Sequence, residues 1–428
     1  MSGSGHVTSI VRPHRVRPVT GRDPEERGRT ATALELLYDL VFVVAIGQTA
    51  DQFAHMLARG HVVAATGAFL FSMYAVLWAW ISFSWFASAF DTDDWLHRLA
   101  TMVQMVGATI LGLGVPAVFR SLDAGHGLDN GVMVVGYVVM RAAMVFQWLR
   151  AARQSPRYRA TCLAYVWTIV IAQLGWVATS LLPLSLPQMG VVGGVLLLIE
   201  LIGPYLAETR LGGTPWHPHH IAERYGGLAI IALGEGVVGT VASLSAVVQV
   251  QGWTLDAVLV AVAGLGLTFG MWWKYFLIAA GDILHAHRER AYKWAYGGMP
   301  IVAAIAATGA GLHVAALFIE HHAQIGPVAV VLSLAIPVGA YMLGVYWLYS
   351  VLYAGLHPFH VLLLAITVAV LVAAPLLAAA GVSMTLCLLV VMVAPAVSVV
   401  GYEIRGYRHV AAALSRATNS PRTNLTKP

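Results

Sequence analysis

Two acidic residues, Glu35 and Asp39, lie four positions apart inside the first long apolar segment of the chain. In a helix this spacing places both carboxylates on one face, with Asp39 about 6 Å deeper than Glu35. Two like charges on one apolar face repel, so at least one of them needs a basic partner or a bound proton. The pair is therefore a candidate for a proton or ion path, and a structural ion pair is the alternative.

A third acid, Glu235, lies between two glycines, Gly234 and Gly236. It follows Glu223 by twelve residues, or about 18 Å along a helix, which places it near the centre of a bilayer. Flanking glycines permit close helix contact or local unwinding. Glu235 is the best single site candidate, and a neutral glutamic acid that helps helices to pack is the alternative. Glu223 and Arg224, which begin the same segment, are weaker candidates that could simply mark the membrane interface.

Two basic residues also lie within apolar segments, Arg141 and Lys274. Arg141 is too central to reach the membrane surface, so it needs an acidic partner, and we expect Asp39 or Glu235. We further expect Asp39, Arg141 and Glu235 to converge on one cavity. Lys274, and likewise Glu200, lies nearer a segment end, where snorkelling to the surface competes with pairing.

Three short motifs are rich in Asp or His: DTDD at 91–94, HPHH at 217–220 and HPFH at 357–360. Clustered carboxylates suit hard cations, but a helix cap is the simpler interpretation of the first motif. The second lacks regular metal-ligand spacing, and the third contains a proline typical of a helix start. The chain also has no phosphate-binding loop and no H-E-x-x-H motif. We therefore expect no catalytic residue, no cofactor and no metal.

The elements that position these residues follow from composition. Of 428 residues, 59% are hydrophobic and only 11% are charged, and the mean hydropathy is +0.75. Soluble domains are far less apolar, and a spanning helix needs roughly 20 apolar residues. The sequence predicts an all-α polytopic membrane bundle with about twelve spanning segments, near 34–57, 62–89, 95–119, 130–152, 160–182, 188–208, 222–247, 254–280, 297–320, 326–353, 359–380 and 382–404.

The polar ends of the chain indicate its orientation. Residues 1–33 are rich in Arg and Pro and lack an apolar signal segment, so they are predicted to form a disordered cytoplasmic tail, and residues 406–428 a second cytoplasmic tail. With the N-terminus inside, the loop Lys and Arg residues fall almost entirely on the inner side, and the outer loops hold only Arg59 and Arg120. This asymmetry predicts that both termini are cytoplasmic.

An internal repeat is also predicted. A shift of 188 residues aligns several rare residue types without a gap: Glu35 with Glu223, Trp85 with Trp273, Asp94 with Asp282, and His97 with His285. Residues 34–208 and 222–405 would then be two parallel six-helix halves, although chance identity between helix pairs is the alternative. Solute paths in such proteins commonly lie between the halves.

Four segments resemble the low temperature requirement A (LtrA) family of bacterial membrane proteins: ELLYDLVFVVAI at 35–46, DTDDWLHRL at 91–99, YVVMRAAMVFQW at 137–148, and HHIAERYGGLAIIALGE at 219–235. The resemblance covers residues 30 to about 405. It implies a multi-pass protein of the bacterial cell membrane, and it transfers no agreed activity and no catalytic residue. Gly236 departs from the serine expected at that position, which puts in doubt any role for a hydroxyl there.

These observations favour passage of a small solute or ion between the two halves, with proton coupling through Asp39 or Glu235. One alternative is an ion channel of two six-helix repeats, an architecture similar to that of the lysosomal potassium channel family. Others are a sensor or assembly factor without flux, and an intramembrane lipid-modifying enzyme using HPFH at 357–360. We expect membrane lipids as partners. Nucleic acid is excluded because the basic residues are spread over separate loops.

Overall fold

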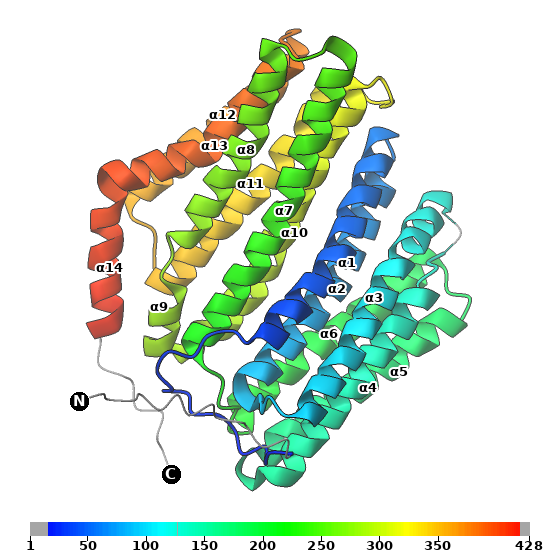
Figure 1. Ribbon diagram of the computed structural model, residues 1–428, viewed down its shortest axis with the longest axis vertical. Helices are drawn as coiled ribbons and strands as arrows, with labels where there is room; N and C mark the ends of the chain where they lie inside the picture. Colours follow the sequence, from blue (N-terminus) through cyan, green and yellow to red (C-terminus); the bar gives the residue numbers. More distant parts are fainter. Residues whose placement is uncertain (1–15, 126, 420–428) are drawn as a thin grey trace, which may run out of the picture.

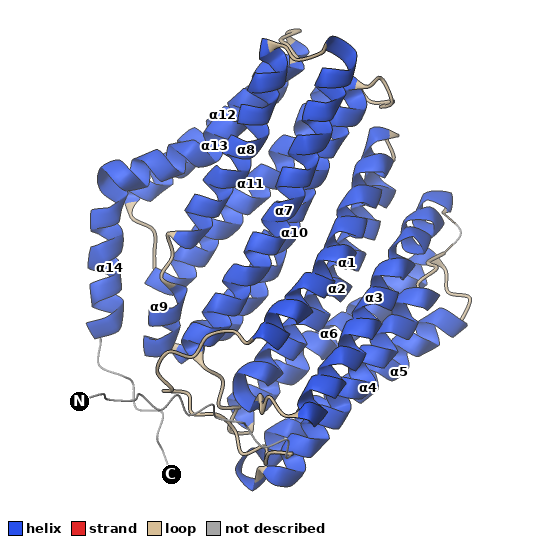
Figure 2. Ribbon diagram, in the orientation of Figure 1, coloured by secondary structure: helices blue, strands red, loops and turns tan. Residues whose placement is uncertain are grey.

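The computed structural model describes residues 16–125 and 127–419, and every regular element within them is helical (Figures 1 and 2). Twelve of the helical segments in this part of the chain are long and apolar enough to cross a membrane. The all-α fold class and the number of spans predicted from the sequence are therefore confirmed. The two parallel six-helix repeats remain a prediction.

The spanning helices are α1 (Ala33–Ala58), α2 (Val62–Phe90), α3 (Trp95–Ala124), α4 (Gly131–Gln154), α5 (Arg159–Leu181), α6 (Leu186–Arg210), α7 (Pro218–Gln251), α8 (Leu255–Phe276), α10 (Ala291–Ile319), α11 (Pro327–Tyr353), α12 (Pro358–Ala379) and α13 (Met384–Gly401). Each predicted apolar segment meets one of these helices, with ends shifted by a few residues. Two shorter helices, α9 (Ala280–Ala286) and α14 (Tyr407–Asn419), lie beside the bundle (Figure 1).

Side-chain caps determine where several helices begin. Thr32 and Glu35 form a reciprocal capping box at the start of α1, in which each side chain accepts the backbone N–H of the other residue. Asp94 caps α3 by accepting the N–H of His97 at 2.8 Å, which confirms the interpretation of DTDD as a cap. His217 caps α7 through the N–H of His220. These caps set the register of the polar residues on α1 and α7.

Helix α1 joins the earlier and later parts of the bundle. It packs against α2 and α3 on one side and against α7 and α10 on the other (Figure 1). Helix α10 is the most enclosed span, with 83% of its most apolar window buried. Polar residues on the shared faces of α1, α7 and α10 are therefore held among protein helices rather than among lipid tails.

The two ends of the bundle differ in charge, because the Lys and Arg residues of the connections lie almost entirely at one of them. Both described chain ends, at residues 16 and 419, lie at the end where α1 begins (Figure 1). We name this the basic end, and it holds the connections at 91–94, 155–158, 211–217, 287–290 and 354–357. The opposite end holds the connections at 59–61, 127–130, 182–185, 252–254, 320–326 and 380–383.

The N-terminal segment differs from the predicted disordered tail of residues 1–33. Residues 16–32 run across the basic end and are held by specific hydrogen bonds: the Arg17 N–H donates to Asp94 at 2.8 Å, and the Arg29 guanidinium donates to the Ala87 carbonyl at 2.9 Å. The last turn of α2 and the cap of α3 supply acceptors that bind this segment. Residues 1–15 of the predicted tail lie outside the described residues.

The C-terminal segment differs from the prediction in a similar way. A π-helical turn, Tyr402–Gly406, connects α13 to α14, so Tyr407–Asn419 is helical where the sequence analysis placed a tail. Residues 420–428 lie outside the described residues. The cytoplasmic location of residues 406–428 stays a prediction.

Candidate functional site

A buried ion pair joins α1 to α7 in the half of the bundle nearer the basic end. Arg224 holds both oxygens of Asp39, with Nη2–Oδ1 and Nη1–Oδ2 distances of 2.7 and 3.0 Å. Trp80 on α2 donates its indole N–H to Asp39 Oδ1 at 2.7 Å. All three side chains are buried. The two-point contact and the third donor satisfy the carboxylate within the protein, as a buried charge requires.

A second acid–base pair lies one helical turn closer to the basic end. The Nε2 atom of His220 on α7 lies 3.1 Å from Glu35 Oε1, and both side chains are buried. Glu35 and Asp39 on α1 therefore face His220 and Arg224 on α7, which are also four residues apart. We name these four residues the α1–α7 ladder. The expectation that the acids on α1 need a basic partner is confirmed.

Two adjacent residues in the first two turns of α7, Glu223 and Arg224, have different surroundings. Glu223 is exposed, and its carboxylate accepts the backbone N–H of Ala31 at 3.3 Å. Arg224, by contrast, is only 1% exposed. The interface interpretation therefore suits Glu223 and is wrong for Arg224, because a helix turns about 100° per residue and so points neighbours in different directions.

Glu235 lies farther along α7, where α1 and α10 approach it closely. A Cβ atom placed on Gly47 of α1 would lie 2.9 Å from Glu235 Oε1, and one on Gly309 of α10 would lie 2.5 Å from the Glu235 carbonyl carbon. The carboxylate is half-buried, and no described residue forms a hydrogen bond or ion pair with it. The structure thus places this acid inside the bundle without a partner.

Close packing against α8 explains why position 236 is a glycine. A Cβ atom there would lie 2.5 Å from the Thr268 hydroxyl oxygen of α8, so Thr268 occupies the space that a serine side chain would need. Thr268 donates its hydroxyl to the Gly264 carbonyl of its own helix at 2.9 Å. A hydroxyl group is therefore present beside Gly236, although it comes from a neighbouring helix.

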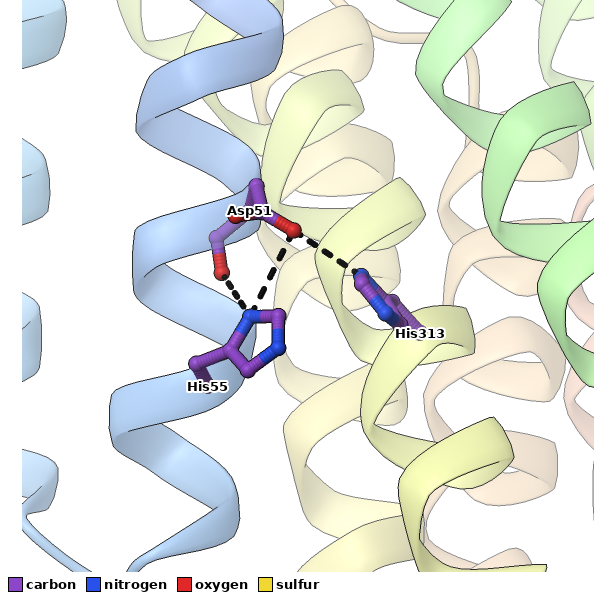
Figure 3. A group of neighbouring side chains, drawn as sticks. All are labelled: Asp51, His55 and His313. Atoms are coloured by element: carbon purple, nitrogen blue, oxygen red, sulfur yellow. Dashed lines mark hydrogen bonds and ion pairs between the residues drawn. The ribbon is translucent and has the colours of Figure 1, made fainter. Parts of the chain in front are cut away.

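One turn beyond Glu235, three polar side chains meet between α1 and α10 (Figure 3). Asp51 Oδ1 lies 3.4 Å from Nδ1 of His55 on the same helix and 3.6 Å from Nδ1 of His313 on α10. Gly47 and Asp51 are four residues apart, as are Gly309 and His313. The cluster therefore lies about 6 Å beyond the glycines that contact Glu235.

The sequence analysis did not single out this cluster. The spacing D-x-x-x-H at 51–55 places both side chains on one helical face, which is a signal that could have been found. His313 has no local signal, because its proximity to Asp51 depends on how α10 packs on α1. We name Asp51, His55, His313 and Glu235 the opposite-end group.

An apolar layer separates the α1–α7 ladder from the opposite-end group. Phe42 and Ile46 lie between Asp39 and Gly47 on α1 and are buried. Leu228 and Ala232 lie between Arg224 and Glu235 on α7 and are buried as well. The eight residues from Asp39 to Gly47 correspond to about 12 Å along the helix. Polar contacts therefore do not run continuously from one end to the other.

Arg141 does not pair with Asp39 or Glu235, and this prediction is wrong. Its partner is Glu200 on α6, at 3.3 Å, and its guanidinium also donates to the Tyr137 hydroxyl at 2.6 Å. The expected convergence of Asp39, Arg141 and Glu235 on one cavity is wrong as well. The reason is packing: α4 lies on α3 and α5, whereas Asp39 and Glu235 lie on the faces shared by α1, α7 and α10.

Glu200 is a buried acid with several partners rather than a snorkelling side chain. Besides Arg141, it accepts hydrogen bonds from the Tyr74 hydroxyl and the Trp176 indole, each at 3.4 Å. The ion pair borders a narrow cleft whose cavity volume is only about 30 Å³. Most of the cleft lining is aromatic or apolar: Trp78, Ile81, Trp85, Trp148, Tyr165, Ile169, Pro204, Tyr292 and Tyr296.

Lys274 on α8 is buried and lies over the ring of Tyr346, with Nζ 4.1 Å from the ring centroid. No described residue forms an ion pair with it. Neither of the expected arrangements, snorkelling to the surface or pairing with an acid, is present. A cation–π contact stabilises the ammonium group instead. Lys274 is therefore separate from both the ladder and the opposite-end group.

The DTDD motif stabilises the basic end. Asp94 binds the guanidinium of Arg150 and accepts the backbone N–H groups of Arg17 and His97. Burial alone would raise the pKa of Asp94, but these hydrogen bonds outweigh it and hold the pKa at about 2. Asp91 lies 3.4 Å from Nε2 of His97. Asp91 and Asp94 therefore act in a helix cap and in ion pairs.

The three histidines of HPHH point to different partners. His217 caps α7, His219 lies 3.0 Å from Asp282 at the exposed surface, and His220 contacts Glu35. Burial lowers the pKa of His217, which accordingly favours the neutral ring. The motif therefore does not assemble a metal site, although one of its histidines belongs to the α1–α7 ladder.

Twelve apolar spans with ionised groups buried between them define a polytopic α-helical membrane protein. The family described as bacterial low temperature requirement A protein (LtrA) matches residues 30–395, and the chain belongs to this family. The resemblance found in the sequence is thus confirmed.

One relative is a Rhizobium meliloti (strain 1021) protein described as an uncharacterized protein. It is 26% identical over 295 residues, which cover 65% of this chain and 67% of the relative. No solved structure matches the chain.

Proposed function

We propose that this protein moves a small solute or ion across the membrane, and that a proton binds to and leaves Glu235 on α7 as it does so. The observation that carries the proposal is the unpartnered carboxyl group of Glu235 inside the bundle. An ionised carboxylate at membrane depth is costly without a partner, so it favours binding a proton or a cation. A coupling mechanism needs a carboxyl group that can bind and release a proton or a cation.

The arrangement of ionisable groups along α1 supports a path through the membrane. Glu35, Asp39, Asp51 and His55 lie on this helix, and Glu235 contacts it at Gly47. The twenty residues from Glu35 to His55 correspond to about 30 Å, the thickness of the hydrocarbon layer. Ionisable groups thus occur at several depths beside the same helix.

The apolar layer around Phe42 and Ile46 favours a carrier over an open pore. A proton or cation that reaches Glu235 from the opposite end meets this layer before it meets Asp39. Passage then requires α1 and α7 to move relative to each other, as in alternating access. A channel is the second version of the proposal, and it would need the same layer to become hydrated.

The distribution of Lys and Arg residues supports one orientation of the protein in the membrane. We propose that the basic end faces the cytoplasm of a bacterial cell, because Lys and Arg are concentrated in its connections. The opposite-end group would then face the outside, and protons would reach Glu235 from that side.

The test uses purified protein in lipid vesicles that contain a pH-sensitive dye. A potassium gradient with valinomycin imposes a membrane potential, and proton entry is recorded first alone and then with amino acids, sugars or metal cations outside. We expect wild type to admit protons faster than protein-free vesicles in at least one condition, and Glu235→Gln to lose this flux. Glu223→Gln is the matched control, because Glu223 lies on the same helix and is exposed.

Two outcomes contradict the proposal: equal flux through wild type and Glu235→Gln, or wild-type flux equal to that of protein-free vesicles in every condition. Electrical recording from the same preparation separates the two versions, because a channel gives unitary currents and a carrier does not.

A further inference from the structure

The cluster of Asp51, His55 and His313 has the composition of a transition-metal site. Two imidazoles and one carboxylate, drawn from two helices, approach one another closely enough for all three ligand atoms to lie within 4.8 Å of one another. We propose that these three side chains bind a divalent transition-metal ion such as Zn²⁺ near the opposite end of the bundle (Figure 3).

The distances match the size of such an ion. Zinc binds imidazole nitrogen and carboxylate oxygen at about 2.0–2.2 Å, and tetrahedral geometry then separates neighbouring ligand atoms by about 3.4 Å. Asp51 Oδ1 lies 3.4 Å from His55 Nδ1 and 3.6 Å from His313 Nδ1. Two of the three ligand–ligand distances are thus already close to those of a zinc site.

The local backbone supports this ligand set. Asp51 and His55 are four residues apart on α1, so their side chains emerge on the same face. His313 completes the set from α10, with its ring 5.1 Å from that of His55 and nearly perpendicular to it. His55 Nδ1 also lies 3.0 Å from the Asp51 carbonyl oxygen, a hydrogen bond that metal binding would replace.

The charges around the cluster are compatible with a dication. Glu320 adds negative charge nearby, whereas Arg59 is the opposing positive group. The side chains of Asp51 and His55 are 43% and 45% exposed, so an ion could reach them without unfolding the helices. Three protein ligands leave one tetrahedral position for water or for a transported group.

A bound ion would have a mechanical consequence. It would link α1 to α10 one helical turn from Glu235 and would oppose movement of α1. This consequence rests on the proposed function, whereas metal binding itself does not. Zn²⁺ added on the side of the opposite end would then slow the Glu235-dependent flux.

Zinc titration by calorimetry tests the site directly. The full chain is purified in detergent without a histidine tag, and wild type is compared with His55→Gln, His313→Gln and the double variant. We expect one saturable site in wild type and at least about tenfold weaker binding in each single variant, because metal affinity depends strongly on each group that holds the ion. Cobalt would report tetrahedral binding through its visible absorption.

His61→Gln is the matched control. His61 also contacts a carboxylate, that of Asp123, at the same end of the bundle, but this pair is not part of a three-ligand group among the described residues. Zinc affinity that is unchanged in the double variant overturns the site, as does a folded wild-type protein that shows no saturable binding. Either result can occur with proton flux intact, so it is distinguishable from failure of the proposed function.

Discussion

The α1–α7 ladder and the opposite-end group hold acids between α1 and its neighbouring helices in two different ways. In the ladder, each acid has its own base from α7, and all four side chains are buried. In the opposite-end group, Glu235 has no partner among the described residues, and Asp51 shares two half-exposed histidines. Pairing of each acid with its own base stabilises the contact between helices, while an acid without a base leaves room for a proton or an ion.

This comparison separates structural charge from functional charge within one helix interface. A saturated pair resists change because removing either partner leaves a buried charge uncompensated. An unsaturated acid gains little from its surroundings, so its state can change at a small cost. The experiments below test the distinction, beginning with the largest expected effect.

Removing Arg224 should have the largest effect on stability. Arg224→Met leaves the buried carboxyl group of Asp39 without its partner, and we expect a loss of about 3–5 kcal/mol in unfolding free energy. Thermal unfolding followed by tryptophan fluorescence measures the loss. Arg98→Met is the control, because the Arg98 side chain is 54% exposed and its pair with Asp93 should contribute less than about 1 kcal/mol. Similar losses of unfolding free energy in both variants would contradict a stabilising role for the α1–α7 ladder.

Adding one methyl group beside Glu235 should also destabilise the protein. Gly309→Ala places a Cβ atom 2.5 Å from the backbone of Glu235, and such overpacking costs about 1–3 kcal/mol. Gly67→Ala in α2 is the control, because no atom lies within 4 Å of its added Cβ. The difference in unfolding temperature between the two variants measures the closeness of α7 and α10. Equal unfolding temperatures would show that α7 and α10 are not closely packed at Glu235.

Because the pKa of Asp94 is lowered by its partners, we expect the free energy of unfolding to depend on pH. Its pKa is lowered to about 2, so it contributes stability above the ordinary aspartate pKa near 3.9, and this stability is lost as the pH falls toward 2. The contribution is about 2 kcal/mol. Unfolding curves between pH 5 and pH 2, for wild type and Asp94→Asn, measure it. The variant should be less stable at neutral pH and should vary less with pH, and parallel curves would count against the pairing.

Glu235→Gln should have the smallest effect on stability, within about 0.5 kcal/mol of wild type or slightly stabilising. The substitution removes an acid that has no partner and keeps its size, so no interaction is lost. Thermal unfolding in the preparation used for flux measurements checks this. A loss as large as that of Arg224→Met would mean that Glu235 holds the bundle together, and the contrast between the two regions would be lost.

Much of the fold could be predicted from sequence because hydropathy and capping are local. Twelve apolar segments predicted the spanning helices, and Asp94 was predicted to cap α3. The shared face of Glu35 and Asp39 followed from helical periodicity alone. The same reasoning failed for residues 16–32, because a polar segment looks disordered when the helix ends that bind it are distant in sequence.

The sequence by itself determined which groups enter the membrane, since charge and hydropathy belong to each residue. Only the tertiary structure decided which of them meet: Arg141 with Glu200, Arg224 with Asp39, and His313 with Asp51. These partners lie on different helices, and their contact depends on the rotation and packing of each helix. Periodicity assigns a residue to a face of its helix, but it does not determine which neighbour that face will meet.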